Sequence, residues 1–519
     1  MIENRYLNIL SWFFCLALSI GLGRADVLQD FSAEFWRWRA ANRPYSADDI
    51  PRLERPAGFV PDWSSAAIER RRREYAAFSQ RWKQLDSPQF NIHERVDYRL
   101  LGSALARVRW ELDVSPAWQR DPQFYIAQTL GALLETRLAD QPDQDILRSI
   151  PQTLANAKKN LTHIRTPFAA LAIEQLKDIR TRLPDEKAIA ALEDFRAWLQ
   201  HQPASPNTAV GREAYSFFLH EVALLPYTPE EMLDISRHEF DRAVALESFE
   251  RNRNTGLPEL PLFPSTEAQI ERCRRDEAGV RRFLMEHHIL TVPDWMPHYR
   301  YAPIRPELHA LSGFSEMDSF LKNEGIRYIE PPSDKLGYFA RSMAQDPRAD
   351  MVHEGVPGHY FQLELSGRHE DPIRRQYYDS SANEGIGFYS EEMMLQAGYF
   401  GDSPRTREMI YNYMRLRVLR VEVDVKLATG QFTIAQAANY LQHTVPMDAA
   451  TAGSEAAAFA AIPGQAISYQ IGKTQILRFL ARARMQQGGN FRLQSFHDFL
   501  WKNGNVPIAL QEEEYLWRP

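Results

Sequence analysis

A helical periodicity limits the folds open to this chain more than any other feature of its sequence. It runs almost without interruption from Asp30 to about Gln200, where apolar residues recur at spacings of three and four. The clearest segments read FSAEFWRWRAA, DYRLLGSALARVRWELDV and FYIAQTLGALLETRL. Long helices joined by short loops form bundles or layered helical arrays. Since 519 residues exceed what one compact core usually holds, we expect a mainly α, multi-helical fold in two lobes.

The rest of the chain begins with a linker and continues into a second set of helices. HQPASPNTAVG, residues 201–211, is rich in proline and small polar residues and therefore predicts a loop. Behind it, Thr228 and Glu231 have the spacing of a capping box. GIRYIEPPSDKLGYFARSM, residues 325–343, has strand-like pieces and predicts a small β element. We therefore expect an N-terminal helical region over 26–205 and a second region over 206–519, or one continuous domain.

The N-terminus predicts the compartment. LNILSWFFCLALSIGLG, residues 7–23, is an apolar run that follows Arg5 and precedes the small residue Ala25. This is the pattern of a secretory signal peptide, so we expect residues 1–25 to be removed and the protein to be secreted or periplasmic. An uncleaved anchor or an internal helix is the alternative. No other stretch is long and apolar enough to span a membrane, which predicts no stable membrane insertion after cleavage.

Charge and cysteine content give no support to nucleic-acid binding or to a disulfide framework. The net charge of −7 gives no reason to expect nucleic-acid binding. The chain has 2 cysteines, and Cys15 lies in the expected signal peptide. This leaves Cys273 alone, so the sequence predicts no disulfide framework.

Two histidines and a glutamate stand close together in the segment MVHEGVPGHYFQ, at His353, Glu354 and His359. Six residues of helix turn through about 600°, so in a straight helix the two imidazoles would point about 120° apart. Pro357 cannot continue a regular helix, and the glycines on either side of it let the backbone distort. The sequence therefore predicts a bulge that brings His359 back toward His353.

A second acidic motif, NEGIGFYSEE, follows at residues 383–392. Apolar residues on two faces of this predicted helix indicate that it is buried, and buried carboxylates need partners. Glu384 as a third metal ligand and Glu391 as acceptor for a ligand histidine's free N–H would meet that need. Alternatively, these glutamates pair with arginines such as Arg417 or Arg420. Two histidines and a glutamate, with an open position for water and Glu354 beside it, are a ligand set of catalytic zinc.

HEGVPGHYFQ and NEGIGFYSEE resemble the paired signatures of the domain-of-unknown-function 885 family, whose members are distantly similar to gluzincin-type zinc peptidases. GREAYSFFL, TPEEML, RYIEPP and IPGQAISYQIG extend the similarity along the chain. The resemblance implies one Zn²⁺ per chain on His353, His359 and Glu384, with Glu354 as general base and Gln362 as an orienting residue. It also implies a deep cleft between the lobes that admits short peptides.

The chain departs from this family pattern farther downstream. Family members usually have a histidine at the position of Ala428 and an Arg-Tyr pair at the positions of Ala458 and Phe459. Arg420 and Asp424 are retained on the polar face of the predicted helix, and we expect both to support the metal ligands or the substrate. The three replacements would remove donors able to stabilise an oxyanion, each worth roughly 3 kcal/mol of barrier.

Two further polar residues belong to the segment PGQAISYQIG. We expect Tyr469 to be catalytic and Gln465 to lie beside the substrate or a ligand. The structural alternative is a tight turn and a packed tyrosine.

These residues together predict a zinc hydrolase that acts on a short peptide or a small amide. Glu354 would deprotonate the attacking water and pass the proton to the leaving amine. One alternative is a specialised hydrolase or lyase for a small metabolite amide or ester, which the altered downstream residues motivate. The other is a catalytically weak, metal-containing protein that captures peptides. Glu354→Gln separates enzyme from binding protein, because it should abolish turnover and spare zinc.

Overall fold

The computed structural model describes residues 27–46, 55–56, 58–311 and 325–517. It is 69% helix and 2% strand, which confirms the prediction of a mainly α fold. Among the helices of these ranges, none is long and apolar enough to cross a membrane. The expected signal peptide over residues 1–25 lies outside the described residues.

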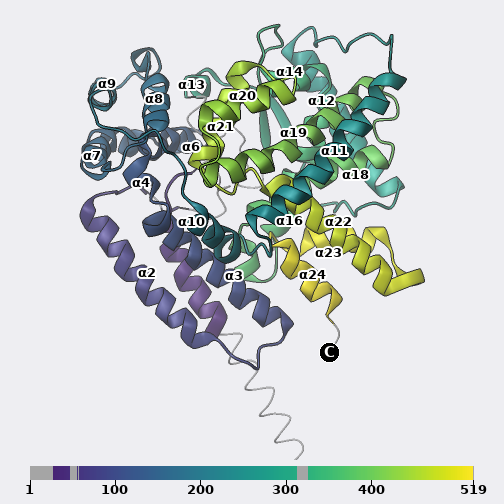
Figure 1. Cartoon of the computed structure of the whole chain (residues 1–519), viewed down its shortest axis with the longest axis horizontal. Coiled ribbons are helices and arrows are strands. Elements are labelled where there is room, and N and C mark those ends of the chain that lie inside the picture. The colour runs from purple at the N-terminus through teal and green to yellow at the C-terminus, as the bar shows by residue number, and fades with distance from the viewer. Residues whose placement is uncertain (1–26, 47–54, 57, 312–324, 518–519) are drawn as a thin grey trace, which may run out of the picture.

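The N-terminal helices pack around one apolar core on the left of Figure 1, because each buries residues spaced three or four apart. Local signals start several of them. Asn91 and Glu94 form a capping box at α3, and Asp185 caps α9. The elements are a helix over 27–42, α2 (Ser65–Leu85), α3 (Ile92–Arg109), η1 (Trp110–Val114), α4 (Ala117–Arg120), α5 (Pro122–Ile126), η2 (Ala127–Gly131), α6 (Ala132–Leu138), α7 (Gln144–Asn160), α8 (Thr166–Gln175), η3 (Ile179–Thr181) and α9 (Glu186–Leu199).

The predicted linker over 201–211 contains turns and extended chain, and a second group of helices follows it. The capping box of Thr228 and Glu231 is present at the start of α11, as predicted. This long helix packs along α19. The elements of this part are α10 (Arg212–Phe217), η4 (Phe218–Val222), α11 (Pro229–Arg253) and α12 (Thr266–Glu286).

Strand β2 (Ile326–Ile329) lies within the β element predicted over 325–343, and it pairs in parallel with β1 (Arg300–Pro303), which lies outside that range. Arg300 pairs with Ile326 and Pro303 with Ile329. The short helix α13 (Pro306–His309) follows β1, and the helices of the metal motif follow β2.

The helix α18 (Ser380–Gln396) lies at the centre of the C-terminal region. Its residues from Ser380 to Leu395 are all buried, among α16, α19, α22 and η6. It approaches α22 closely at Gly472, where a Cβ would lie 2.1 Å from the carbonyl oxygen of Ser381. The other elements are α14 (Tyr338–Gln345), α15 (Arg348–Asp350), η6 (Met351–Gly355), α16 (His359–Ser366), α17 (Pro372–Gln376), α19 (Pro404–Ala428), α20 (Ile434–Thr444), α21 (Ala449–Ala461), α22 (Ser468–Gln487), η7 (Gly488–Asn490), α23 (Leu493–Lys502) and α24 (Ile508–Leu516).

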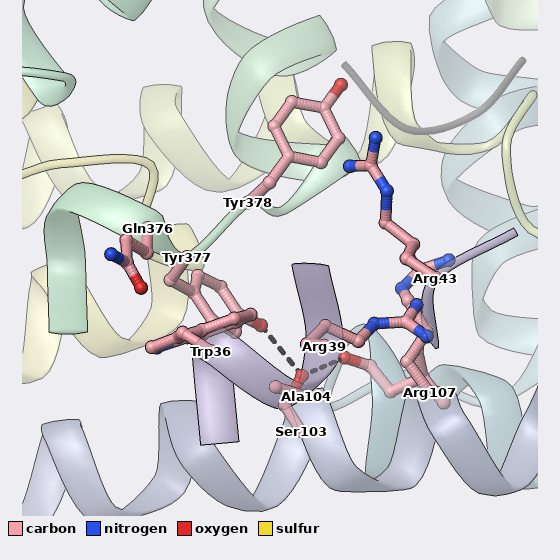
Figure 2. Close-up of a pocket in the computed structure, with 10 residues that line it drawn as sticks. Trp36, Arg39, Arg43, Ser103, Ala104, Arg107, Gln376, Tyr377 and Tyr378 are labelled. Carbon is pink, nitrogen blue, oxygen red and sulfur yellow. Dashed lines mark hydrogen bonds between the residues drawn. The ribbon is translucent and has the colours of Figure 1, made fainter. Parts of the chain in front are cut away.

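Buried polar contacts join the N-terminal helices to the C-terminal region. Arg374 forms ion pairs with Asp97 of α3 at 2.9 Å and with Glu514 of α24 at 2.5 Å. Ser103 of α3 donates to the carbonyl of Val222 and accepts from the Tyr377 hydroxyl at 2.7 Å (Figure 2). The division at residue 205, the two lobes and the deep cleft stay predictions.

Candidate metal centre

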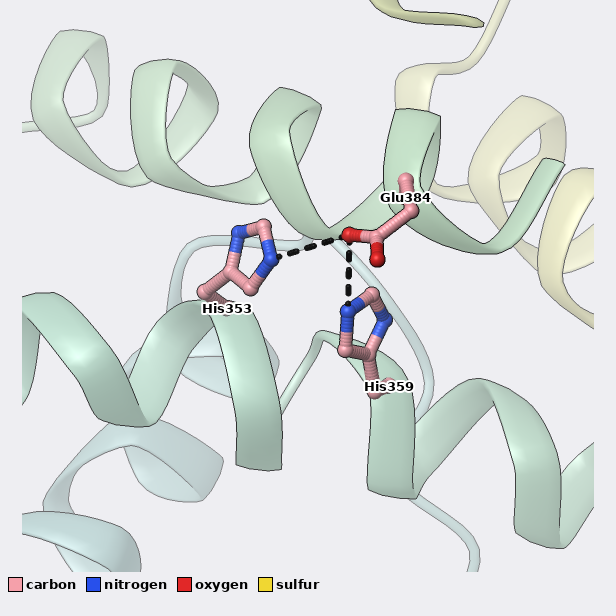
Figure 3. Close-up of side chains that lie close together, drawn as sticks. All are labelled: His353, His359 and Glu384. Atoms are coloured by element: carbon pink, nitrogen blue, oxygen red, sulfur yellow. Dashed lines mark hydrogen bonds and ion pairs between the residues drawn. The ribbon is translucent and has the colours of Figure 1, made fainter. Parts of the chain in front are cut away.

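Three separate elements bring His353, His359 and Glu384 together. His353 lies in η6, His359 opens α16, and Glu384 is in the first turns of α18. The Glu384 Oε2 atom lies 3.3 Å from Nε2 of His353 and 3.1 Å from Nε2 of His359, between the two imidazoles in Figure 3. All three side chains are buried, and each offers one ligand atom within 4.8 Å of the others. The sequence motifs thus converge on one point.

The predicted bulge between the histidines is present. The η6 turn ends at Gly355 and α16 begins at His359, so no continuous helix joins the two ligands. The carbonyl of Pro357 accepts a hydrogen bond of 2.6 Å from the Trp501 indole. A Cβ at Gly358 would lie 1.7 Å from the carbonyl oxygen of His353, so only glycine fits this sharp turn.

Gly387, three residues after Glu384 in α18, leaves space for the two imidazoles. A Cβ at this position would lie 2.9 Å from Cε1 of His353 and 2.9 Å from Cε1 of His359. Both rings therefore rest against a helix surface that lacks a side chain.

The donor set and its spacing fit zinc. Two histidines and a glutamate are the protein ligands of one common class of catalytic zinc sites. Two ligand atoms bound to a tetrahedral zinc at its usual bond lengths lie about 3.3 Å apart. The two nitrogen–oxygen separations given above agree with that value. His353, His359 and Glu384 would therefore hold the ion through Nε2, Nε2 and a carboxylate oxygen.

Charged groups lie beside the imidazoles and shift the pKa values of the ligand side chains. Glu391 Oε1 lies 2.7 Å from Nδ1 of His353 and 3.2 Å from Arg417, so the histidine partner of the metal interpretation and the arginine partner of its alternative are both present. Burial and Arg417 oppose protonation of His353, but Glu384 and Glu391 raise its pKa to about 9. Burial opposes ionisation of Glu384, yet the two imidazoles hold its pKa well below the usual range. The Nδ1 atom of His359 has no hydrogen-bond partner among the described residues.

Glu354 follows His353 directly and is half-buried. Burial opposes its ionisation, but Arg327 of β2, His359 and His353 hold the pKa of this carboxyl below its ordinary value. Glu354 is therefore a carboxylate at neutral pH, which is the state a general base requires.

Tyr469, at the start of α22, packs against a ligand. Its ring is stacked on that of His353, with centroids 5.8 Å apart and an interplanar angle of 14°. The guanidinium groups of Arg417 and Arg420 lie 4.7 and 4.6 Å from the Tyr469 ring centroid. Arg420 itself pairs with Glu455 at 2.6 Å. Burial and the charge of Glu384 raise the pKa of Tyr469 well above its usual value, so the phenol stays protonated.

Gln465 lies beside the ligand Glu384, on a turn that contacts Asp424. The amide of Gln465 lies 3.5 Å from Oε1 of Glu384. Asp424 accepts hydrogen bonds from the backbone N–H groups of Gly464 at 2.9 Å and Ala466 at 2.8 Å. Gly464 has a φ of +95°, which glycine adopts without strain. Asp424 therefore holds the turn that carries Gln465.

Gln362 supports the ligand helices from behind. Its carbonyl oxygen accepts from Asn383 at 3.2 Å and from Asn505 at 3.4 Å, and its amide donates to the Gly504 carbonyl at 3.3 Å. Since Asn383 precedes Glu384, this contact joins the helix of His359 to that of Glu384.

The three positions that depart from the family pattern lie in different surroundings. Ala428 packs in an apolar cluster with Tyr215 and Phe218. Ala458 is exposed, and Phe459 is buried with its ring 5.4 Å from the guanidinium of Arg420.

Two residues of the centre were missed by sequence reasoning. Gly387 could have been found, because it lies three residues after Glu384 and therefore on the same helix face. Trp501 gave no signal, since its contact with Pro357 joins residues 144 positions apart.

The whole fold is shared with solved bacterial structures. A protein from Shewanella oneidensis, described as a candidate lipoprotein of unknown function, is 18% identical with a TM-score of 0.70, over 95% of this chain and 100% of that one. A protein from Colwellia psychrerythraea, described as a candidate lipoprotein, is 16% identical with a TM-score of 0.71, over 95% of this chain and 98% of that one. At these identities the likeness concerns the fold.

No curated protein matches this chain. Residues 314–514, which carry every residue of the candidate metal centre, match the family described as bacterial protein of unknown function (DUF885), and this confirms the resemblance that the two motifs predicted.

Proposed function

We propose that the chain is a zinc-dependent hydrolase that cleaves peptide or amide bonds. The observation that carries this proposal is the convergence of His353, His359 and Glu384 on one point, with the carboxylate Glu354 next in sequence to a ligand. When bound, zinc would supply Lewis acidity toward a water molecule and a substrate carbonyl. The resemblance of the two motifs to their family implies a distant similarity to gluzincin-type zinc peptidases, which use chemistry of this kind.

The residues around the ligands have distinct roles in the proposal. Glu354 takes a proton from the attacking water and delivers it to the leaving amine. Tyr469 keeps its phenol proton and can donate a hydrogen bond to the substrate carbonyl oxygen as negative charge develops. Glu391 orients His353, and Gln465 orients Glu384. Arg417 and Arg420 hold the Tyr469 ring in place.

We also propose that the protein is exported to the periplasm or secreted. The apolar run at residues 7–23 has the pattern of a signal peptide. The two structural relatives described as candidate lipoproteins agree with export. An N-terminal sequence that begins at Asp26 in protein recovered outside the cytoplasm would support cleavage after Ala25.

The test measures zinc content and hydrolysis on the same preparations of wild type, His353→Ala and Glu354→Gln. Wild type should hold about one zinc per chain and cleave members of a short-peptide or small-amide library. His353→Ala should lose both properties, and Glu354→Gln should keep the metal and lose turnover by a factor of at least about 10². His443→Ala, which replaces an exposed histidine, is the matched control and should behave as wild type.

Three outcomes would contradict the proposal. Zinc that is retained in His353→Ala would place the metal elsewhere. Unchanged turnover in Glu354→Gln would show that Glu354 is not the general base. A wild type that holds zinc but has no turnover would favour a peptide-binding protein.

A further inference from the structure

An open pocket lies between α22, α24 and the loop that links η4 to α11. The two helices that form most of it lie side by side near the C-terminus in Figure 1. Its volume is about 420 Å³, which is within the usual range of sites for small organic ligands. None of the residues assigned above to the metal centre lines this pocket, so it is a separate place on the molecule.

Gln475 of α22 gives the first indication of a ligand. It lines the pocket and is only 5% exposed. Its side-chain carbonyl oxygen is buried without a hydrogen-bond partner, and its amide nitrogen makes no hydrogen bond to a described residue either. A buried amide without partners costs free energy, and it can both donate and accept. A peptide group offers the matching pair, an N–H for the oxygen and a C=O for the nitrogen.

Arg478, about one helical turn after Gln475, gives a second, independent indication. Residues three apart on a helix are neighbours on its surface. A nitrogen of the Arg478 guanidinium donates a hydrogen bond of 2.8 Å to the hydroxyl of Tyr227, in the loop before α11. Within the described part of the chain this is its one hydrogen bond, and it forms no ion pair there. Since a guanidinium has five N–H donors, Arg478 has donors and a positive charge left for an anion.

The other charged residues of the pocket wall are already paired. Arg482 of α22 forms an ion pair of 2.8 Å with Glu512 of α24, between the two helices that form the pocket. Glu513 forms an ion pair of 3.0 Å with Arg99 of α3. An anionic group of a ligand is therefore expected at Arg478.

We propose that this pocket binds the C-terminal end of a peptide, with Arg478 at the carboxylate and the amide of Gln475 at the adjacent peptide group. Arginine can hold a carboxylate through paired hydrogen bonds. In a peptide, a single Cα atom separates the terminal carboxylate from the last peptide group, so two neighbouring side chains on one helix can contact both. The site goes beyond the proposed hydrolase, and it depends on neither zinc nor turnover.

The experiment measures binding to the full chain by calorimetric titration at constant ionic strength. The probes are N-acetylalanine, which has a peptide group and a carboxylate, its C-terminal amide, which lacks the charge, and propionate, which lacks the peptide group. Each is titrated into wild type and into His353→Ala, so that binding or turnover at the metal centre is recognised. N-acetylalanine should bind both proteins equally, and the two incomplete probes should bind at least about tenfold more weakly.

Variants of the pocket wall decide the question. Gln475→Leu should weaken the binding of N-acetylalanine roughly tenfold without lowering the free energy of unfolding, because the amide has no partner within the described protein. Arg478→Gln should weaken it roughly ten- to hundredfold and remove the preference over the amide probe. Gln487→Leu and Arg484→Gln, the matched changes on α22 outside the pocket, should bind as wild type.

Other results would overturn the proposal. Equal affinity for N-acetylalanine and propionate would show that the peptide group is not recognised. Binding that is lost in His353→Ala would place the ligand at the metal centre. Unchanged affinity in both Gln475→Leu and Arg478→Gln, or no binding of N-acetylalanine to wild type, would show that this pocket does not hold a peptide end.

Discussion

Gly387 makes the metal centre sensitive to a single methyl group. In Gly387→Ala, the new Cβ would collide with both ligand imidazoles at 2.9 Å, so at least one ring must move. Misplaced ligands should reduce zinc affinity at least about tenfold, while the helix itself gains from alanine. Zinc affinity is measured by competition with a chelator, and folding by circular dichroism.

Gly453→Ala is the control for this prediction. Gly453 also lies in a helix, and a Cβ there would meet nothing within 4 Å. It should leave zinc affinity unchanged. Equal zinc affinity in Gly387→Ala and wild type would show that the ions bind without both imidazoles in their present positions.

Glu391 acts on the metal through His353. Glu391→Gln keeps an acceptor near Nδ1 but removes the negative charge that makes this imidazole a stronger ligand. Zinc affinity should fall roughly ten- to hundredfold, with the site still able to fill at high zinc. Glu455→Gln, which takes the carboxylate from Arg420 instead of Arg417, should change zinc affinity less than about threefold. The same loss in both variants would mean that the arginines, and not His353, transmit the effect.

Among the elements, the bulge between η6 and α16 depends on a helix far away in the chain. Trp501→Phe removes the indole hydrogen bond to Pro357 and leaves that buried carbonyl without this partner. The free energy of unfolding should fall by about 1–2 kcal/mol, and zinc should bind more weakly because the ligand His359 lies two residues after Pro357.

Trp82→Phe is matched to this change, since it removes an indole hydrogen bond of 3.0 Å to the carbonyl of Tyr98 among the N-terminal helices. Trp82→Phe should lower the free energy of unfolding without changing zinc affinity. If zinc affinity is unaltered in Trp501→Phe, the bulge holds its shape without the indole.

The elements show which parts of this protein could be predicted from sequence. The helices and the capping box at Thr228 depend on residues within a few positions, and they were predicted. Strand β2 lies in the predicted β segment, but its partner β1 lies 26 positions earlier, at Arg300 against Ile326, and was not predicted. The metal motifs were found because Pro357 and the spacing of the histidines left few ways to bring them together. The role of Asp424 could not be found, because periodicity places it on a polar face but cannot show that this face meets the turn at Gly464.

For the molecule as a whole, His497 should make the free energy of unfolding depend on pH in the acidic range. It is fully buried, with Nδ1 2.7 Å from the carbonyl of Ile289 and Nε2 2.8 Å from the hydroxyl of Tyr389. Burial lowers its pKa from 6.5 to about 4. A folded-state pKa below the unfolded one gives stability that is complete above pH 6.5 and is lost as the pH falls toward 4. The difference from 6.5 to about 4 corresponds to roughly 3 kcal/mol.

Urea unfolding at several pH values between 4 and 7 measures the contribution of His497. It is the difference in the free energy of unfolding between wild type and His497→Gln. Several buried aspartates also titrate near this range, so each protein alone would show a mixed curve. The two curves should converge as the pH falls. Curves that run parallel from pH 7 to 4 would show that His497 does not protonate on unfolding.

Along the chain, the ligands of the metal centre come before the residues that hold them in place. The three ligands come first, at His353, His359 and Glu384. They are followed by Gln465, which contacts Glu384. The segments around His359 are held by Trp501 and Asn505, which lie still farther along the chain. During synthesis the three ligands therefore leave the ribosome before the residues that hold them in place. The ligands can take their final positions only after these later segments have folded against them, and in an exported protein the metal would be acquired in the compartment where that folding takes place.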